Sequence, residues 1–469
     1  MLFPTLNFAL FFLLVAALMV PFERYFETRK VVLVVASYAF YAFWNWHFCF
    51  LLAFSSMVSY GAGRLIGAAE QERMRCWVMR AAVVIHLGVL GTFKYFDFVV
   101  TSANDLVHQL GLSGELPFVE IILPVGISFY TFHGISYVVD VYRRDVSVCR
   151  RPTDMLLYLA FFPQLVAGPI VRAAFFLPQL YSPKPVAVEV GPALLLILGG
   201  LFKKVVIASY LATDLVDPVF FDPAAFPATD LLLALYGYAM QIYCDFSAYS
   251  DIAIGCAMLL GFRFPINFDQ PYRAHSLQDF WRRWHISLSS WLRDYLYKPL
   301  GGSRGGLWRT VRNLAITMLL GGIWHGAAWK FVAWGALHGG GLIVERLLAP
   351  LVGAWADTRL ARALATVLVF HFVCLCWLPF RADSFDTVLV YLATMMQLQA
   401  GSVQASPFVV GLIALGMVLH FLPRDLPRRS ARVIALWPSW ALAMCFGVGV
   451  LAVDALGPDG IPPFIYFQF

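Results

Sequence analysis

A single histidine, His325, stands in a charge-free stretch that runs from Asn313 to Trp329. The stretch is long enough to enter a lipid bilayer, where an ionisable side chain is expensive and needs a partner or a function. Imidazole takes up and releases protons near neutral pH, so His325 is a candidate for proton transfer or catalysis. On these residues alone, the alternative is a buried histidine bonded to a carbonyl group of a neighbouring helix.

A second histidine lies in a basic segment rich in tryptophan. Residues 281–292 have the spacing of one amphipathic helix, with Trp281, Trp284 and His285 on its apolar side. A surface helix anchored by tryptophan at the lipid headgroups and by arginine on phosphates explains every residue of this pattern except His285. His285 is therefore the second candidate for chemistry.

Basic residues gather in this segment and in the glycine-rich turn at 298–306 that follows it. Such a turn can hold a phosphorylated ligand from the cytosol. Two lysines that interrupt an apolar run near residue 203 are further candidates. The predicted donor-binding residues are Arg282, Arg283, Arg293, Lys298, Arg304, Lys203 and Lys204.

A third cluster has helical spacing: Gln241, Asp245 and Tyr249 follow one another at intervals of four residues and line one helix face. A carboxylate beside an apolar helix pairs with a buried cation or orients a histidine. A structural salt bridge between Asp245 and one of the two lysines, Lys203 or Lys204, is the alternative to a role in chemistry.

The composition excludes an ordinary soluble protein. Of the 469 residues, 60% are hydrophobic and only 13% are charged, against about 25% charged in soluble chains. The net charge of +6 is too small and too scattered for a nucleic-acid partner. The eight cysteines have no metal-ligand spacing, so we expect no metal site. Residues 1–22 lack the basic start and cleavage site of a signal peptide, and we expect a retained first helix.

The loop charges predict a topology, because excess Lys and Arg marks the cytoplasmic side of a membrane. Residues 263–312 contain nine basic and three acidic residues and are placed inside. The acidic loops 101–120 and 213–230 are placed outside, together with both termini. An uncharged hairpin is expected at 31–63, turning at Asn45-Trp46-His47.

Further helices are expected near 81–100, 121–139 and 433–453. Residues 155–171 contain Pro163, Gly168 and Pro169 and are expected to be re-entrant. Residues 387–423 are long enough for two crossings, although the flanking charges allow one. We expect about ten to twelve crossings plus helices that do not span, without a separate soluble domain.

The motifs of the chain resemble those of the membrane-bound O-acyltransferases, in particular the bacterial branch that acetylates alginate or cellulose and D-alanylates teichoic acids. The similarity covers most of the chain, with supporting matches at 162–170 and 201–208. The main motifs are YCDFSAYSDIAIG at 243–255, FWRRWHISLS at 280–289, YLYKPLGG at 295–302 and GIWHG at 322–326.

The resemblance implies a fold and a set of catalytic residues. It implies an all-α polytopic membrane protein, a ring of tilted helices with re-entrant and interfacial helices around a central tunnel. One domain would span 1–469, with N-terminal helices at 1–140, a catalytic core at about 155–345 and C-terminal helices at 364–453. His325 would be the catalytic histidine and His285 the second characteristic one. Trp324 and Trp329 would wall the passage and exclude water.

The resemblance also implies a reaction. Acetyl-CoA from the cytosol would donate the acetyl group, and no cofactor would be bound permanently. His325 would act as general base or carry the acyl group covalently. The acetyl group would cross the bacterial inner membrane to an exopolysaccharide, cellulose or alginate. Membrane lipid, a periplasmic acetyltransferase and the polysaccharide synthesis complex would be the partners.

Two alternatives remain at this point. A proton-coupled transporter or flippase of a polysaccharide precursor also places polar residues and broken helices at the membrane midplane. Against it, the chain has no paired halves with matching interruptions. The other alternative is acyl or D-alanyl transfer to teichoic acid, a lipid or a peptide, with a thioester carrier protein as donor.

Overall fold

The computed structural model describes residues 3–22, 25–112, 114, 116–117, 121–166, 168–182, 188–352, 358–397, 401–458, 460 and 462–465. All regular structure within these ranges is helical. Five helices are long and apolar enough to cross a membrane: Phe48–Ala68, Glu72–Gln109, Val190–Phe221, Arg359–Arg381 and Ser439–Leu456. The prediction of an all-α polytopic membrane protein is confirmed, whereas the number of crossings stays a prediction.

The chain packs as two compact units. Unit 1 contains Met1–Val188 and Cys256–Phe264, and unit 2 contains Glu189–Gly255 and Pro265–Phe469. The single domain over 1–469 stays a prediction. The acidic loop at 213–230 is described throughout, but residues 113, 115 and 118–120 of the other acidic loop lie outside the described residues.

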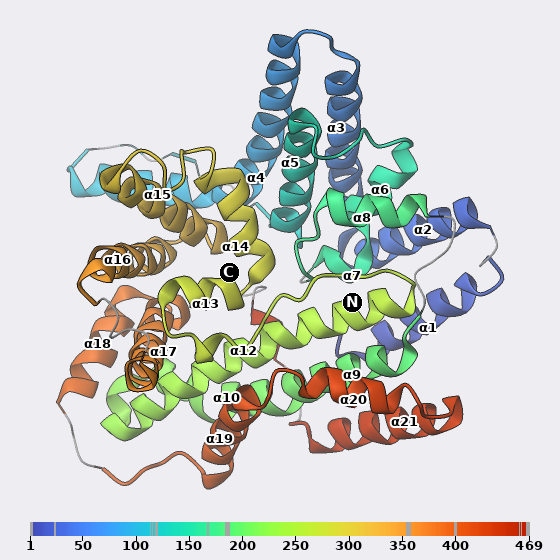
Figure 1. Cartoon of the computed structure of the whole chain (residues 1–469). Helices are drawn as coiled ribbons and strands as arrows, with labels where there is room; N and C mark the ends of the chain where they lie inside the picture. The colour runs from blue at the N-terminus through green and yellow to red at the C-terminus, as the bar shows by residue number, and fades with distance from the viewer. Residues whose placement is uncertain are drawn as a thin grey trace. The chain divides into compact units, whose positions relative to one another are not determined.

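Unit 1 begins with five helices, and α3, α4 and α5 stand side by side (Figure 1). The predicted hairpin is present, because the Asn45 side chain accepts a 3.0 Å hydrogen bond from the backbone N–H of His47 and ends the first helix. The helices are α1 (Leu6–Met19), α2 (Phe26–Asn45), α3 (Phe48–Ala68), α4 (Glu72–Gln109) and α5 (Ile127–Arg143).

The region predicted to be re-entrant folds into short, broken helices. Phe161, which separates two of them, has ψ 109° and is not helical, and Pro163 fits the first turn of the next helix, where no N–H is needed. Residues 157–165 are wholly buried, whereas the last of these helices is partly exposed. The helices are α6 (Pro152–Ala160), α7 (Phe162–Leu165) and α8 (Ala173–Tyr181).

Unit 2 starts with α9 (Val190–Leu201), which continues through π-helical turns at Phe202–Ala208 and Ala212–Val216 to α10 (Ser209–Leu211) and α11 (Asp217–Phe221). The long helix α12 (Ala228–Leu259) packs closely on α9. A Cβ atom at Gly200 would lie 2.9 Å from the carbonyl oxygen of Ala248, so only glycine permits this approach.

Ion pairs fasten these two helices together. The Lys204 ammonium lies 2.8 Å from the Asp245 carboxylate, and both side chains are at most 4% exposed. Lys203 lies 2.6 Å from Asp251 and donates a 2.8 Å hydrogen bond to Ser247. The prediction that Asp245 forms a salt bridge with one of the two lysines is confirmed.

Asp245→Asn is expected to lower the free energy of unfolding by about 3 kcal/mol, because Lys204 would keep a buried charge without a counter-ion. Unfolding of the purified protein in detergent measures this. Asp251→Asn is the matched control and should be milder, since its partner Lys203 is 20% exposed and Asp251 itself 31% exposed. Normal stability with lost activity for Asp245→Asn would instead place Asp245 in the chemistry.

The rest of unit 2 surrounds the candidate site. Helices α15 and α16 form an antiparallel pair (Figure 1), in which a Cβ atom at Gly335 would lie 2.5 Å from the carbonyl oxygen of Met318. Residues 387–423 contain most of α18 and all of α19. The helices are α13 (Leu277–Arg283), α14 (Ile286–Leu292), α15 (Leu307–His325), α16 (Trp329–Val352), α17 (Arg359–Arg381), α18 (Phe385–Met396), α19 (Pro407–Phe421), α20 (Leu426–Ile434) and α21 (Ser439–Leu456).

Candidate functional site

His325 is the last residue of α15 and is only 4% exposed. Three aromatic rings enclose its imidazole: Trp334 at 4.8 Å, Trp324 at 5.1 Å and Phe380 at 5.4 Å between ring centroids, each edge to face. The catalytic role of this histidine stays a prediction. Aromatic walls of this kind exclude water from the imidazole.

The turn after His325 determines which tryptophan of α16 packs against the imidazole. A Cβ atom at Gly326 would overlap the ring of Phe331, so the chain passes tightly from α15 into α16. Trp329, at the start of α16, points outward and is 59% exposed. Trp334, more than one turn later and 1% exposed, packs against His325 instead, and the role of Trp329 as a wall of the passage stays a prediction.

The predicted amphipathic helix at 281–292 is broken at His285. Its backbone has φ 43° and ψ 55°, in the left-handed region, and separates α13 from α14. The break is stabilised from a distant loop, because the carbonyl oxygen of Asn267 accepts a 2.9 Å hydrogen bond from the N–H of Ile286. The Asn267 side-chain oxygen also accepts hydrogen bonds from the N–H and hydroxyl of Ser287, at 3.1 and 2.8 Å. One continuous helix was thus a wrong prediction, although the burial of its apolar side is confirmed.

The same asparagine orients the imidazole of His285. Nδ1 lies 3.2 Å from the Asn267 Oδ1 atom, which already accepts the N–H of Ser287 and so must be an oxygen. Burial lowers the pKa of His285 to about 3, and the ring is neutral at physiological pH. Nδ1 therefore carries the proton and donates to Asn267, which leaves the lone pair on Nε2. Nε2 has no hydrogen-bond partner among the described residues.

The two histidines contact the same indole. Ring centroids lie 6.0 Å apart for His285 and Trp324, and 5.1 Å apart for Trp324 and His325. On its other side, His285 packs edge-on against Phe246 of α12 at 4.7 Å. Residues far apart in sequence thus form one buried site within unit 2. Sequence reasoning missed Asn267 and Trp334, and neither residue carries a signal of its own in the sequence.

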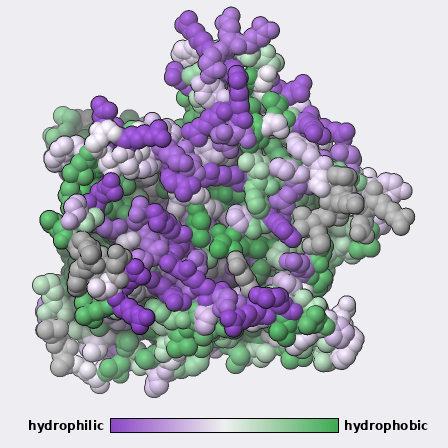
Figure 2. Space-filling model, in the orientation of Figure 1, coloured by the Kyte–Doolittle hydropathy of each residue, from purple (hydrophilic) through white to green (hydrophobic). Residues whose placement is uncertain are grey.

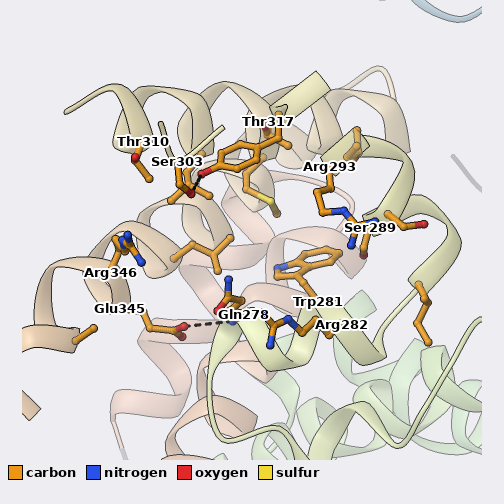
Figure 3. Close-up of a pocket in the computed structure, with 18 residues that line it drawn as sticks. Gln278, Trp281, Arg282, Ser289, Arg293, Ser303, Thr310, Thr317, Glu345 and Arg346 are labelled. Carbon is orange, nitrogen blue, oxygen red and sulfur yellow. Dashed lines mark hydrogen bonds between the residues drawn. The ribbon is translucent and has the colours of Figure 1, made fainter. Parts of the chain in front are cut away.

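A cavity of about 420 Å³ with polar and apolar walls lies beside the second histidine, lined by α13, α14, α15 and α16 (Figure 3). Its lining includes Arg282, Arg293 and Arg346, together with the hydroxyls of six serine, threonine and tyrosine residues. Glu345, also in the lining, accepts the N–H groups of Leu277 and Gln278 and so caps α13. The cavity walls therefore combine three guanidinium groups and one carboxylate with neutral hydrogen-bonding groups and apolar side chains.

Two of the seven predicted donor-binding residues, Arg282 and Arg293, line this cavity; the others do not. Arg293 donates two 2.9 Å hydrogen bonds to Asp294, which also pairs with Lys298 at 2.7 Å. Arg283 pairs with Asp279 at 2.9 Å. Hydrophilic residues gather over α13 and α20 (Figure 2). The remaining predicted residues are Arg304, which is exposed, and the paired Lys203 and Lys204.

The α12 cluster lies on a different side of its helix from Phe246. Asp245 and Tyr249 face Lys204, whose ammonium lies 5.9 Å from the Tyr249 ring centroid. The tail of the chain packs there as well: the N–H of Ile465 donates a 2.9 Å hydrogen bond to Asp245. Gln241, one turn earlier, is half-buried. This cluster stabilises the position of α12, and Phe246 of the same helix contacts the ring of His285.

Comparison with known proteins places these residues in a wider context. The model of the MBOAT family, membrane-bound O-acyltransferase, matches residues 150–382, which include both histidines and the cavity. The chain is 37% identical over 486 residues to a probable alginate O-acetylase of Azotobacter vinelandii, covering 94% of this chain and 95% of that one. It is 34% identical over 446 residues to the peptidoglycan O-acetyltransferase of Helicobacter pylori, covering 88% and 83%. A teichoic acid D-alanyltransferase of Bacillus subtilis is 29% identical over 286 residues, covering 56% and 69%.

Proposed function

Because this chain belongs to the membrane-bound O-acyltransferase family, we propose that it moves acetyl groups from cytosolic acetyl-CoA to hydroxyl groups of an exported polysaccharide, with His325 as the catalytic residue. The chain is an O-acyltransferase and a multi-pass membrane protein. The donor, the acceptor and the partners are the proposed part. The observation that carries the proposal is the pair of buried histidines, His285 and His325, packed on the single ring of Trp324.

His325 moves the proton of the reaction. The acceptor oxygen attacks the thioester carbonyl carbon, its proton passes to the imidazole, the C–O bond forms and the C–S bond breaks. The proton then returns to the leaving thiolate. In the covalent route, imidazole nitrogen attacks first and the acyl group rests on His325 before the hydroxyl takes it. Rapid denaturation at neutral pH distinguishes the routes, since only the covalent one leaves label on the protein.

His285 supplies a fixed hydrogen-bond acceptor. The imidazole ring is neutral and buried, and the hydrogen bond from its Nδ1–H group to Asn267 orients the Nε2 lone pair. Because the ring is already oriented, it does not reorganise during the reaction, which favours positioning of an acceptor hydroxyl that donates its hydrogen bond to Nε2. The ring contact through Trp324 brings this acceptor close to His325.

The cavity on the predicted cytosolic side suits the phosphate groups of acetyl-CoA. Arg282, Arg293 and Arg346 line it, and guanidinium groups bind phosphate through charge-assisted hydrogen bonds. The basic character of 263–312 places this cavity toward the cytosol by the positive-inside rule, with both termini in the periplasm.

The acceptor is proposed from the names of the relatives. Alginate and peptidoglycan, named for two of them, both offer carbohydrate hydroxyls. We propose an exopolysaccharide, alginate or cellulose, outside the bacterial inner membrane, reached through a periplasmic acetyltransferase and the polysaccharide synthesis complex. Membership of an acyltransferase family argues against a transporter or flippase. Because a teichoic acid D-alanyltransferase is also a relative, the test below includes a carrier-protein donor as a possible outcome.

The donor is tested with purified protein in lipid nanodiscs by following release of free thiol from acetyl-CoA. Arg282→Ala is expected to raise KM for acetyl-CoA about tenfold, and the remaining interaction should depend less on salt. Arg304→Ala, an exposed arginine outside the cavity lining, is the matched control and should leave KM unchanged. Thiol release from an acylated carrier protein, with none from acetyl-CoA, would contradict the proposed donor.

A further inference from the structure

A third buried histidine, His338, lies on α16 one turn after Trp334. Its side chain is 0% exposed, and neither ring nitrogen has a hydrogen-bond partner among the described residues. A neutral imidazole carries one donor and one acceptor, and leaving both buried and unbonded destabilises the folded protein. Buried polar groups are normally bonded, so an imidazole in this state indicates a polar occupant.

The rings around His338 explain why the protein itself offers no partner. Phe280 stacks parallel to the imidazole at 6.1 Å, and Phe372 meets it edge-on at 6.1 Å. Trp281 lies at 5.1 Å and Trp334 at 4.7 Å. Indole and benzene rings contain no strong acceptor. The Nε1–H groups of Trp281 and Trp334 are themselves buried without a partner among the described residues.

These rings form a row of contacts between Trp281, which lines the cavity (Figure 3), and His325. Successive contacts between ring centroids run from Trp281 to His338 at 5.1 Å, to Trp334 at 4.7 Å and to His325 at 4.8 Å. In the proposed reaction, a donor whose phosphates occupy the cavity and whose thioester reaches His325 would extend its arm along this row.

We infer that His338, with the indole N–H groups of Trp281 and Trp334, binds an amide of the pantetheine arm of the thioester donor. This inference rests on the proposed function. An amide offers a carbonyl oxygen to the indole or imidazole N–H groups and an N–H to the imidazole lone pair, which matches the unbonded atoms. We assign the amide farther from the sulfur, because two ring contacts separate His338 from His325.

The test compares three acetyl donors on the wild type and on His338→Phe, which keeps an aromatic ring and removes both nitrogens. The value of kcat/KM is expected to fall about tenfold for acetyl-CoA and for S-acetyl-pantetheine, which both contain the farther amide. For S-acetyl-N-acetylcysteamine, which lacks that amide, kcat/KM should stay within about twofold. Trp281→Phe, which removes the indole N–H together with one ring, should give the same pattern across the three donors.

Thermal unfolding without donor supplies an independent readout. His338→Phe should unfold at the wild-type temperature or above, because it removes two unbonded buried nitrogens. His420→Phe is the matched control: the Nε2 atom of His420 accepts a 2.9 Å hydrogen bond from the N–H of Tyr272, so this change should lower the unfolding temperature.

Equal losses on all three donors, or no loss on any, would overturn the role of His338 in donor binding. A wild-type protein that releases no thiol from acetyl-CoA or S-acetyl-pantetheine would instead contradict the proposed function itself. The two failures are therefore distinguished by the wild-type rate.

Discussion

His325→Ala is expected to reduce acyl transfer by at least about 10³-fold while the protein still inserts and folds. The imidazole is the group that accepts the proton of the attacking hydroxyl or carries the acyl group, and removal of such a group costs about this much. Alanine in a site walled by Trp324, Trp334 and Phe380 leaves a small apolar gap, which lowers stability modestly. The measurement is the initial rate of thiol release from acetyl-CoA in nanodiscs.

Leu320→Ala is the control on the same helix, since Leu320 is 45% exposed and lies outside the site. It should transfer at the wild-type rate. A His325→Ala protein that retains a substantial fraction of wild-type activity would move the catalytic role to another residue, and His285 would then be examined first.

His285→Ala is expected to lower kcat about 10²-fold, because it removes the oriented Nε2 acceptor beside Trp324. Asn267→Ala should give a smaller loss, about tenfold, since the imidazole remains but loses the hydrogen bond that fixes its orientation. The rates of both variants are measured with saturating acetyl-CoA, so that donor binding does not enter.

His275→Ala serves as the control for His285. His275 lies nearby in sequence, but its side chain is 50% exposed and its Nδ1 atom lies 3.3 Å from Asp279. Its replacement should leave kcat unchanged. If Asn267→Ala lost as much activity as His285→Ala, the asparagine would contact the reacting groups itself instead of orienting the ring.

The sequence alone predicts the parts of this fold that depend on local pattern. Charge-free runs and loop charges locate the hairpin at α2 and α3 and a helix near 81–100, which lies within α4. The ion pair of Asp245 also follows from its type and surroundings, because a carboxylate beside an apolar helix needs a buried cation.

The remaining features depend on contacts between distant residues. The helix break at His285 requires Asn267, which is 18 residues away, and no periodicity within 281–292 contains that information. The packing of Trp334 against His325 depends on the tight turn at Gly326, which residues near in sequence do not reveal. His338, by contrast, was accessible from the sequence: it stands in an apolar stretch of α16, and the criterion that selected His325 applies to it equally.

The most direct test of the account follows the acetyl group itself. Inside-out membrane vesicles from cells that produce the polymer receive acetyl-CoA labelled in the acetyl group on their outer, cytosolic face. With the wild-type protein, label is expected in the polysaccharide fraction of the lumen as esters that mild alkali releases. With His325→Ala, that fraction should contain no label above background. Equal ester label with and without the imidazole would contradict the claim that His325 transfers the acyl group.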